Sequence, residues 1–560
     1  MMDKFIVLLV ALPLLTAFVA QVLSDKLGRR VVTLSVAAGT LTFALAVLLL
    51  AFKLDGYGTS RIVLAPVWGS LLFDSLTLLM AAVISGISLI VHVYSVRYMA
   101  EDPGYRRFFV LLDAMTGVLL LTIAAGDLIT LLVGWHLIGV VLFFLLNHNN
   151  RSLQAYRYGF WTFITYRFGD VPMVLAAILL YRAFGAWSLP DIFQQIAARP
   201  DALTVFGLPL SETVAGLIAL SAFARSAQFL LHTWLPYTMD GPTPVSALMH
   251  AGIVNAGAFI INRFAPVFVE ANGVLHWVFL VGLVTAVIGS VLMLSQNDIK
   301  KALGYSTMGQ MGFMIMECGV GAFSLAVFHL IAHGLFKGTL FLASGGVIGK
   351  ARHDDGVPKD DLYTFVIERR PTAYRQPWIL MAAITLAVPA LVFGLAHWLV
   401  TDSSVIEQGA IILLFFGWVT GAQLLFSIHR MDSETPWRLV TLAVFSLTLV
   451  VLGYTFISHA FDLFLYPDAQ FRARIYAAAG ISQSEFYILV GVLTAVIVFG
   501  SMLAYRAASY HNERPKQPKR SWLDFYALVS RELYIADVYA LLGRRLIGLS
   551  ARLNLYLRWI

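Results

Sequence analysis

Apolar runs of about 20 residues recur along nearly all of the first 510 positions, and each is long enough to cross a bilayer as a helix. Short segments with charged residues, glycine and proline separate these runs. Counted in this way, the chain holds roughly fifteen spanning helices. The pattern predicts an all-α polytopic membrane protein without a separate soluble domain.

Composition supports this class, because 59 % of the residues are hydrophobic and only 13 % are charged, whereas about a quarter are charged in soluble domains. The first run, Phe5 to Val22, has no clear small-residue cleavage site, so we expect a retained helix and not a signal peptide. Cys318 is the only cysteine, which excludes disulfide frameworks and cysteine-based metal clusters within the chain.

The net charge of +7 comes mainly from loops and the C-terminal tail, where basic residues indicate membrane orientation and not nucleic-acid binding. Loops on one predicted side contain Lys26, Arg29, Arg30, Arg106, Arg107, Arg151, Arg157, Lys300 and Lys301, together with segments 350–375 and 430–438. By the positive-inside rule this side is cytoplasmic. We therefore expect the N-terminus outside and the basic tail from Arg506 inside.

Two long segments have a similar design. Residues 108–262 and 274–429 each hold about five apolar runs with polar interruptions, the pattern of a duplicated transporter core with inverted repeats. We expect residues 1–107 and 438–508 to form flanking transmembrane helices, and residues 509–560 to form a cytoplasmic amphipathic tail.

Residues 221–263 place ionisable side chains in or beside two apolar runs, namely Arg225, His232, His250 and Arg263. Between the runs lie Pro236, Gly241, Pro242 and Pro244. Charge at membrane depth is costly and therefore marks function, and an interrupted helix is tolerated where it lines a water-filled cavity. This stretch predicts a broken helix in an ion path.

His329, His333 and Lys337 are spaced four residues apart, so they share one helical face over roughly 12 Å. This arrangement favours a proton relay, with structural hydrogen bonding as the alternative. A zinc site is a weaker alternative, because no carboxylate follows in that helix and the Lys337 ammonium would repel a cation. We expect no metal in this chain.

Arg225, Gln228 and His232 are three and four residues apart, which predicts one shared helical face. Arginine keeps its proton, so Arg225 suits a fixed charge that tunes the pKa values of its neighbours. It needs a carboxylate or a water-filled cavity. Asp170 is a candidate partner, although Arg167 and Asp170 also have the spacing of a purely structural pair with each other.

Three further histidines stand alone in apolar runs: His136, His250 and His397. A proton stop-over and an ordinary hydrogen-bonded helix contact are equally open for His136. His250 gains support from the adjacent proline-rich break, whereas His397 has no comparable support.

These residues lie in stretches that resemble the signature segments of antiporter-type subunits of respiratory complex I and of multisubunit Na+/H+ antiporters. The segments are SAQFLLHTWLPYTMDGPTPVSALMHAG, QNDIKKALGYSTMGQMGFM and FHLIAHGLFKGTLFLASGGVIG, extended by FDSLTLLM, VRYMAED and the RxGD of Arg167 to Asp170. The resemblance covers roughly residues 70–350. The tail ELYIADVYALLGRRLIGLSARLN resembles the end of the family's largest subunit.

The chain also departs from the family's pattern. Proton-pumping members carry Trp-Glu where this chain has Trp135-His136, and lysine where it has Arg225. LAVPALVFGLAHWLVTD replaces a lysine-containing segment, with His397 near the missing lysine. The resemblance therefore implies an ion path without the usual Glu/Lys pair of the first channel.

Within the family, the short tail after residue 508 favours a resemblance to the membrane subunit of DAB-type two-component inorganic-carbon pumps. That resemblance implies a cation path, with the proton as first choice over Na+, in a bacterial inner membrane. It also implies a large soluble zinc-containing partner, similar to β-carbonic anhydrase, at the cytoplasmic face. The zinc and the CO2 hydration chemistry would belong to the partner, so this chain is expected to be a transport subunit without a cofactor.

Two alternatives remain open. The first is a proton- or sodium-translocating subunit of a complex I-like or multisubunit cation/proton antiporter assembly. The second is a membrane-bound metalloenzyme built on His329 and His333. For a soluble partner, segment 350–375 and the tail from Trp522 are the expected docking surfaces, although both are equally suited to contact with water or anionic lipid.

Overall fold

The computed structural model describes residues 2–344 except 66–68, 150, 203, 206, 239–240 and 297–298, then residues 459–480 and 520–557, with isolated positions between 387 and 495. The chain divides into two compact units. One comprises Met1–Gly319, His329–Ala343 and Pro518–Ile560, and the other comprises Val320–Phe328 and Ser344–Gln517. All sites discussed below lie in the first unit.

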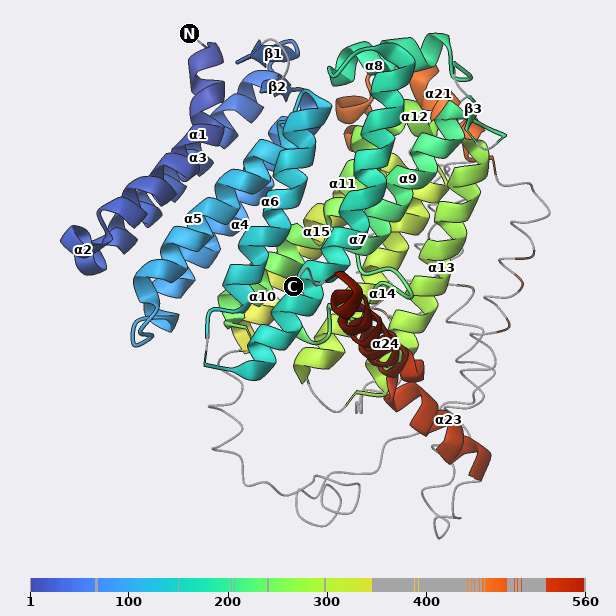
Figure 1. Cartoon of the computed structure of the whole chain (residues 1–560). Helices are drawn as coiled ribbons and strands as arrows, with labels where there is room; N and C mark the ends of the chain where they lie inside the picture. Colours follow the sequence, from blue (N-terminus) through green and yellow to red (C-terminus); the bar gives the residue numbers. More distant parts are fainter. Residues whose placement is uncertain are drawn as a thin grey trace. The chain divides into compact units, whose positions relative to one another are not determined.

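The N-terminal part of this unit is a layer of long helices, visible in blue in Figure 1. Its long members are α1 (Met2–Val22), α3 (Val31–Leu54), α4 (Ser75–Tyr98) and α5 (Tyr105–Ile123), with the short α2 (Ser24–Leu27) and η1 (Gly28–Arg30) in between. Strands β1 (Ser60–Val63) and β2 (Ser70–Phe73) form an antiparallel hairpin between α3 and α4. Asp74 then starts α4, because its carboxylate accepts a hydrogen bond from the Thr77 N–H.

The next helices bring the predicted polar residues into the bundle. They are α6 (Leu128–Leu146), α7 (Leu153–Phe184), α8 (Leu189–Ala198) and α9 (Leu210–Arg225). Asp127 and Ser152 cap α6 and α7, and Gly185 ends α7 in the left-handed conformation that glycine tolerates best. A second small hairpin, β3 (Thr204–Val205) with β4 (Leu208–Pro209), precedes α9.

The predicted break is present, but it begins earlier than the cluster from Pro236 to Pro244 on which the prediction rested. Helix α9 ends at Arg225, and the described residues 226–238 and 241–242 contain no α-helix. The chain then forms α10 (Thr243–Leu248), a π-helical turn η3 (Met249–Ile253), α11 (Ala256–Arg263) and α12 (Ala265–Phe268). Positive φ values at Ala227 (47°) and Leu230 (73°) are incompatible with a right-handed helix. The predicted helical face shared by Arg225, Gln228 and His232 is therefore wrong.

Two further helices pack closely against each other: α13 (Asn272–Leu294) and α14 (Ile299–Gly319). A Cβ atom at Gly312 would lie 2.4 Å from the backbone nitrogen of Ala286, and one at Gly282 would lie 2.5 Å from that of Met316. Small residues at such positions allow membrane helices to approach this closely. Helix α15 (Phe323–Ser344) follows, and it contains the His329, His333 and Lys337 series.

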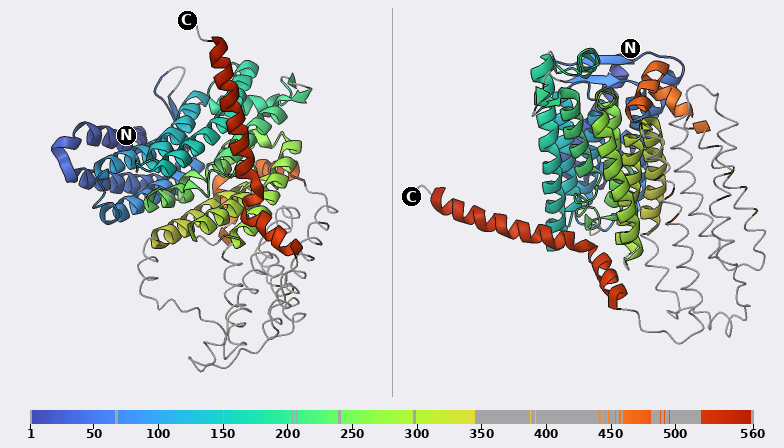
Figure 2. Two further views of the ribbon diagram at one scale, coloured as in Figure 1. Left: turned by 60° about the horizontal axis from the view of Figure 1, so that its bottom comes forward. Right: turned by 90° about the vertical axis from the view of Figure 1, so that its right-hand side faces the viewer.

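The described C-terminal tail of the first unit is helical: α23 (Arg520–Ser530), the short turn η5 (Glu532–Tyr534) and α24 (Ile535–Leu557). Figure 2 shows α24 running across the ends of the long helices of this unit instead of parallel to them. Leucines and arginines share its exposed surface, which is typical of a helix at a membrane interface. In the second unit, the described α21 (Ala469–Ala478) is a short helix.

Among the described residues, eight helices are long and apolar enough to cross a membrane. They are Phe5–Val22, Gly28–Leu54, Ser75–Tyr98, Leu128–Leu146, Leu153–Phe184, Thr243–Arg263, Asn272–Met293 and Phe323–Ala343. The predicted all-α polytopic class is confirmed. The count of roughly fifteen spans and the repeat boundaries stay predictions, because most of residues 345–458 and 481–519 lie outside the described part.

Candidate functional site

A first polar centre lies where α6, α7 and α9 meet, and it consists of Arg225, Asp170, Arg167 and His136. Asp170 Oδ1 accepts a hydrogen bond of 2.9 Å from Arg225 Nη2. Asp170 Oδ2 lies 3.1 Å from Arg167 Nη2 and 3.1 Å from His136 Nδ1. One carboxylate therefore faces three basic side chains, and the two pairings considered for Asp170 occur together.

Two glycines allow this convergence. A Cβ at Gly169 would lie 2.9 Å from the Ala224 Cβ, so α7 approaches α9 closely beside Asp170. At Gly139 on α6, a Cβ would lie 2.5 Å from the Arg167 guanidinium. The RxGD pattern thus supplies a charge, a close helix contact and a carboxylate within four residues.

The Arg225 side chain is fully buried, with an exposed fraction of 0 %. Its guanidinium carbon lies 4.5 Å from the centre of the Trp135 ring and 4.2 Å from that of Tyr166, and it also donates to the backbone oxygen of Trp135. Aromatic faces attract a cation most strongly where water is excluded. Two arginines against one carboxylate leave the centre with excess positive charge.

A second polar centre surrounds the middle of α15. Its members are His329, His333 and Lys337 on α15, Glu317, Gln310 and Ser306 on α14, and His250 on η3. A Cβ at Gly334 would lie 2.6 Å from the Ala251 carbonyl oxygen, so α15 presses directly against the π-helical turn. This close contact brings His250 towards the α15 series.

His329 is held between two acceptors on α14. Its Nδ1 lies 2.9 Å from Glu317 Oε1, and its Nε2 lies 2.8 Å from Gln310 Oε1. Both ring nitrogens of His329 therefore have a partner on α14. The pair is strongly shielded, since the Glu317 side chain is only 3 % exposed.

The neighbouring groups are less completely paired. Lys337 donates a hydrogen bond of 2.8 Å to Ser306 and is buried. His333 and His250 are buried too, and none of their four ring nitrogens has a hydrogen-bond partner among the described residues. Buried polar atoms without partners are costly, so these histidines mark a place where water or a passing ion would gain contacts.

The broken segment lies between the two centres. His232 is fully buried, both of its ring nitrogens lack a partner within the described part, and its ring centroid lies 6.3 Å from that of Tyr305. Tyr305 precedes Ser306, the residue that binds Lys337. A ring contact therefore joins His232 to α14, the helix that also carries the Ser306 partner of Lys337.

A third ionic contact fixes the far end of the broken helix. Arg263 Nη1 lies 2.5 Å from Asp74 Oδ2, and Arg263 also donates to Thr77 and to the backbone oxygen of Ile123. Desolvation would raise the pKa of the Asp74 carboxyl, but the Arg263 guanidinium outweighs it and lowers that pKa below its usual range. This contact joins α11 to α4 and to α5.

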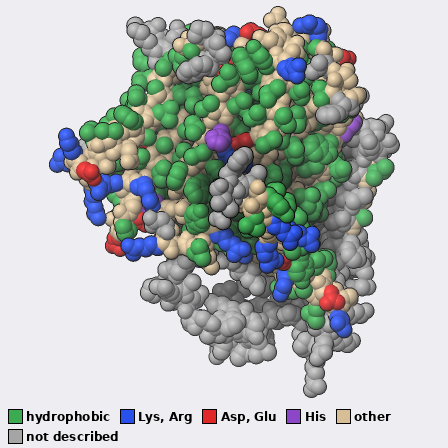
Figure 3. Space-filling view, viewed as in Figure 1, with side chains coloured by type: hydrophobic (Ala, Val, Ile, Leu, Met, Phe, Trp, Pro, Cys, Tyr) green, Lys and Arg blue, Asp and Glu red, His purple; other side chains and the backbone are tan. Residues whose placement is uncertain are grey.

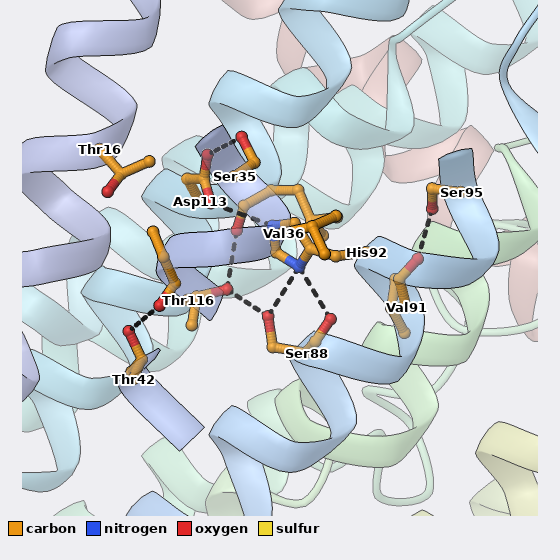
Figure 4. Close-up of polar contacts among 12 residues, drawn as sticks. Thr16, Ser35, Val36, Thr42, Ser88, Val91, His92, Ser95, Asp113 and Thr116 are labelled. Carbon is orange, nitrogen blue, oxygen red and sulfur yellow. Dashed lines mark hydrogen bonds and ion pairs between the residues drawn. The ribbon is translucent and has the colours of Figure 1, made fainter. Parts of the chain in front are cut away.

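Figure 4 shows a separate buried network among α3, α4 and α5. His92 Nε2 lies 3.0 Å from Asp113 Oδ1, its Nδ1 lies 2.8 Å from the Ser88 carbonyl, and Ser35 donates to Asp113 Oδ2 at 2.5 Å. The hydroxyl oxygens of Ser88 and Thr116, 2.5 Å apart, form a further hydrogen bond of this network. The paired state of His92 and Asp113 indicates a structural link between helices, in contrast to His333.

Sequence reasoning missed Glu317, Asp74, His92 and Asp113 as partners. Each is an ionisable residue in or beside an apolar run, the same signal that singled out His136. His397 lies outside the described residues. Within the described part, no group of three or more His, Cys, Asp or Glu side chains is arranged to hold a metal ion.

Comparison with known proteins relates this geometry to a family. A family model described as the transmembrane part of NADH:quinone oxidoreductase and Mrp antiporter subunits matches residues 125–426, more than half of the chain. The chain belongs to this family. A second model, described as the N-terminus of chain 5 of NADH-ubiquinone oxidoreductase (complex I), matches residues 67–109.

The chain has relatives among inorganic-carbon transporter subunits and among complex I subunits, the two groups that the sequence resembles. The chain is 57 % identical over 556 residues to the "Probable inorganic carbon transporter subunit DabB1" of Halothiobacillus neapolitanus, covering 98 % of each chain. It is 28 % identical to the "NADH-quinone oxidoreductase subunit L" of Rickettsia felis, over 84 % of this chain and 77 % of that protein. The chain is thus an antiporter-type, multi-pass membrane subunit, similar to a protein named as a carbon transporter subunit.

Solved structures show the same fold. The Mrp complex of Dietzia contains a chain with a TM-score of 0.55 and 22 % identity, covering 99 % of this chain and 63 % of that one. The archaeal membrane-bound sulfane sulfur reductase contains another such chain, with a TM-score of 0.55 and 17 % identity. The match covers 86 % of the present chain and 99 % of that one. The present chain spans less than two thirds of the Mrp relative.

Proposed function

We propose that this chain conducts protons as the membrane subunit of an energy-coupled pump that accumulates inorganic carbon. The observation that supports it best is Lys337, a buried amine beside His250 and His333, whose ring nitrogens lack hydrogen-bond partners among the described residues. A lysine can release its proton when it is desolvated, unlike an arginine. His250 and His333 are thus available as acceptors beside Lys337.

The chemistry of the second centre favours the proton over Na+. Hard metal cations are bound by several oxygen ligands. In the second centre the oxygens of Glu317, Gln310 and Ser306 already pair with His329 and Lys337, and the remaining groups are imidazoles. A bare cation would be repelled by the ammonium at short range. A proton needs only a chain of donors and acceptors, and side chains spaced along one helical face can supply it.

The carbon-pump part of the proposal rests on the similarity to the Halothiobacillus protein. In this proposal the chain works with a large soluble subunit that resembles a carbonic anhydrase, holds the zinc and performs the CO2 hydration. The proton gradient would make that hydration run in one direction, so that bicarbonate accumulates. Such coupling requires that the proton path in this chain and the zinc site in the partner both bias one conformational equilibrium.

The proposed orientation has the C-terminal tail in the cytoplasm. Figure 3 shows lysine and arginine side chains gathered towards the end of the molecule where α24 lies, with a largely apolar surface above. Basic residues on this side agree with the positive-inside rule. The tail then lies on the face where the soluble partner would bind.

Co-expression provides the test. This chain and the adjacent zinc-protein gene should together restore growth in air to a bacterium that lacks carbonic anhydrase, and an uncoupler should abolish the bicarbonate uptake. Each chain expressed alone is the control and should not restore growth. Growth restored by this chain alone, or uptake unaffected by collapse of every cation gradient, would contradict the proposal.

A cation/proton antiporter subunit is the second candidate, supported by the similarity to the Rickettsia protein and to the Mrp chain. Transport by this chain and its soluble partner, purified together and placed in proteoliposomes, distinguishes the carbon pump from the antiporter. Sodium efflux driven by a pH gradient, in the absence of inorganic carbon, would favour the antiporter.

A further inference from the structure

The C-terminal tail places a buried carboxylate against the broken segment. Glu532 is only 4 % exposed although it belongs to η5, a short turn between two surface helices. Its Oε2 accepts a hydrogen bond of 2.8 Å from the Tyr237 hydroxyl. A carboxylate is rarely buried unless it is paired or functional, so its place requires an explanation.

The backbone at this turn is strained. Glu532, Leu533 and Tyr534 have φ values of 58°, 57° and 58°, in the left-handed region that residues other than glycine avoid. In this conformation the Cβ atom lies too close to the following carbonyl oxygen. The strained turn directs Glu532 into the bundle, and strained conformations are concentrated at functional sites.

Two other contacts attach the tail to the bundle. Tyr539 on α24 donates a hydrogen bond to the Leu230 carbonyl oxygen, and its ring centroid lies 5.7 Å from that of Trp161. Both contacts hold α24 against the broken segment and α7 without Glu532. The buried carboxylate is therefore not needed merely to attach the tail.

Glu532 also lies beside polar groups of α14. It interacts electrostatically with Tyr305, whose ring neighbours that of His232 at 6.3 Å. Lys301 lies 4.7 Å above the Tyr237 ring. This set of side chains forms the end of the polar series nearest to the tail.

We propose that Glu532 is the proton-exchange group at the cytoplasmic end of the path, supplied to the bundle by the tail. The inference rests on the proposed proton conduction. A proton from the His232 side forms an O–H bond on the Glu532 carboxylate, and that bond breaks when the proton passes to cytoplasmic water. Tyr237 stabilises the ionised form between these steps by donating its hydrogen bond.

The decisive measurement is proton flux through the full chain, with its partner, in proteoliposomes driven by a potassium diffusion potential. Glu532→Gln should lower the flux about ten-fold or more, since a positioned proton carrier contributes at least this much. Glu532→Asp should retain most of it. The exposed tail residue Asp524 provides the matched control, and Asp524→Asn should leave the flux unchanged.

Chemical rescue separates proton exchange from a structural role. Glu532→Ala should lose the flux and regain part of it when formate is added, because a small acid can replace a missing carboxyl group but cannot repair a misplaced tail. Wild-type flux in Glu532→Gln, or failure of formate to restore Glu532→Ala that is inserted in normal amount, would overturn the inference. Absence of flux in the wild type would instead contradict the proposed function.

Discussion

The two polar centres of this chain solve the problem of buried charge in different ways. In the first, the single carboxylate of Asp170 pairs with both Arg225 and Arg167 and also contacts His136. In the second, the Lys337 amine donates to the Ser306 hydroxyl, and His333 has no hydrogen-bond partner in the described part. The first centre therefore holds charge, whereas the second can exchange it.

This difference follows from the side chains themselves. The two guanidiniums of the first centre keep their protons, so they can only set the electrostatic potential felt by nearby groups. Lysine and histidine change charge state at moderate cost when they are desolvated. Between the centres, His232 combines burial with unpartnered nitrogens among the described residues, which relates it to the exchanging centre.

The largest effect should come from removal of the shared carboxylate. Asp170→Asn leaves two guanidiniums without an ionic partner and should lower the free energy of unfolding by about 3–5 kcal/mol. Unfolding in mixed detergent and SDS measures this change. Asp191→Asn removes the surface pair with Arg61, whose atoms are 3.6 Å apart, and should cost about 0–1 kcal/mol. Equal costs for both variants would remove the distinction drawn for the first centre.

Replacement of Lys337 should separate transport from folding. Lys337→Met keeps the length of the side chain and removes its charge, so proton-driven bicarbonate uptake should fall about ten-fold or more while the amount in the membrane stays normal. Lys53→Met, at the end of α3, is the control and should transport normally. Normal uptake in Lys337→Met would exclude this amine from the path.

A smaller effect is expected at the paired histidine. Glu317→Gln replaces the ionic partner of His329 and should lower the free energy of unfolding by about 1.5–3 kcal/mol, the range for a hydrogen bond between charged groups. The double variant Glu317→Gln/His329→Gln should cost less than the sum of the single changes. Strict additivity in this cycle would show that the two side chains do not interact.

The smallest effect is expected at His136. The His136 side chain is 51 % exposed. When it is removed, Asp170 still has its ion pairs with Arg167 and Arg225. His136→Gln should therefore change the free energy of unfolding by about 0.2–1 kcal/mol, and transport only slightly. A loss of transport as large as that of Lys337→Met would make His136 a member of the exchanging path and contradict the assignment of the first centre to fixed charge.

The sequence alone determined the membrane class and the presence of a helix break between Arg225 and Arg263. These features are local, because run length, proline and glycine positions and helical spacing are properties of neighbouring residues. His329, His333 and Lys337 accordingly lie on one helix as predicted. Local spacing failed at Gln228 and His232, where left-handed residues end the helix that the spacing assumed.

Only the tertiary structure decided which charges meet. Asp170 reaches Arg225 across 55 positions, and Tyr237 reaches Glu532 across 295. Periodicity specifies which face of a helix is buried, but the partner on another helix depends on helix contacts such as that at Gly169. Partner choice is a long-range property, and for this reason the fixed-charge centre and the tail carboxylate became visible only in the folded chain.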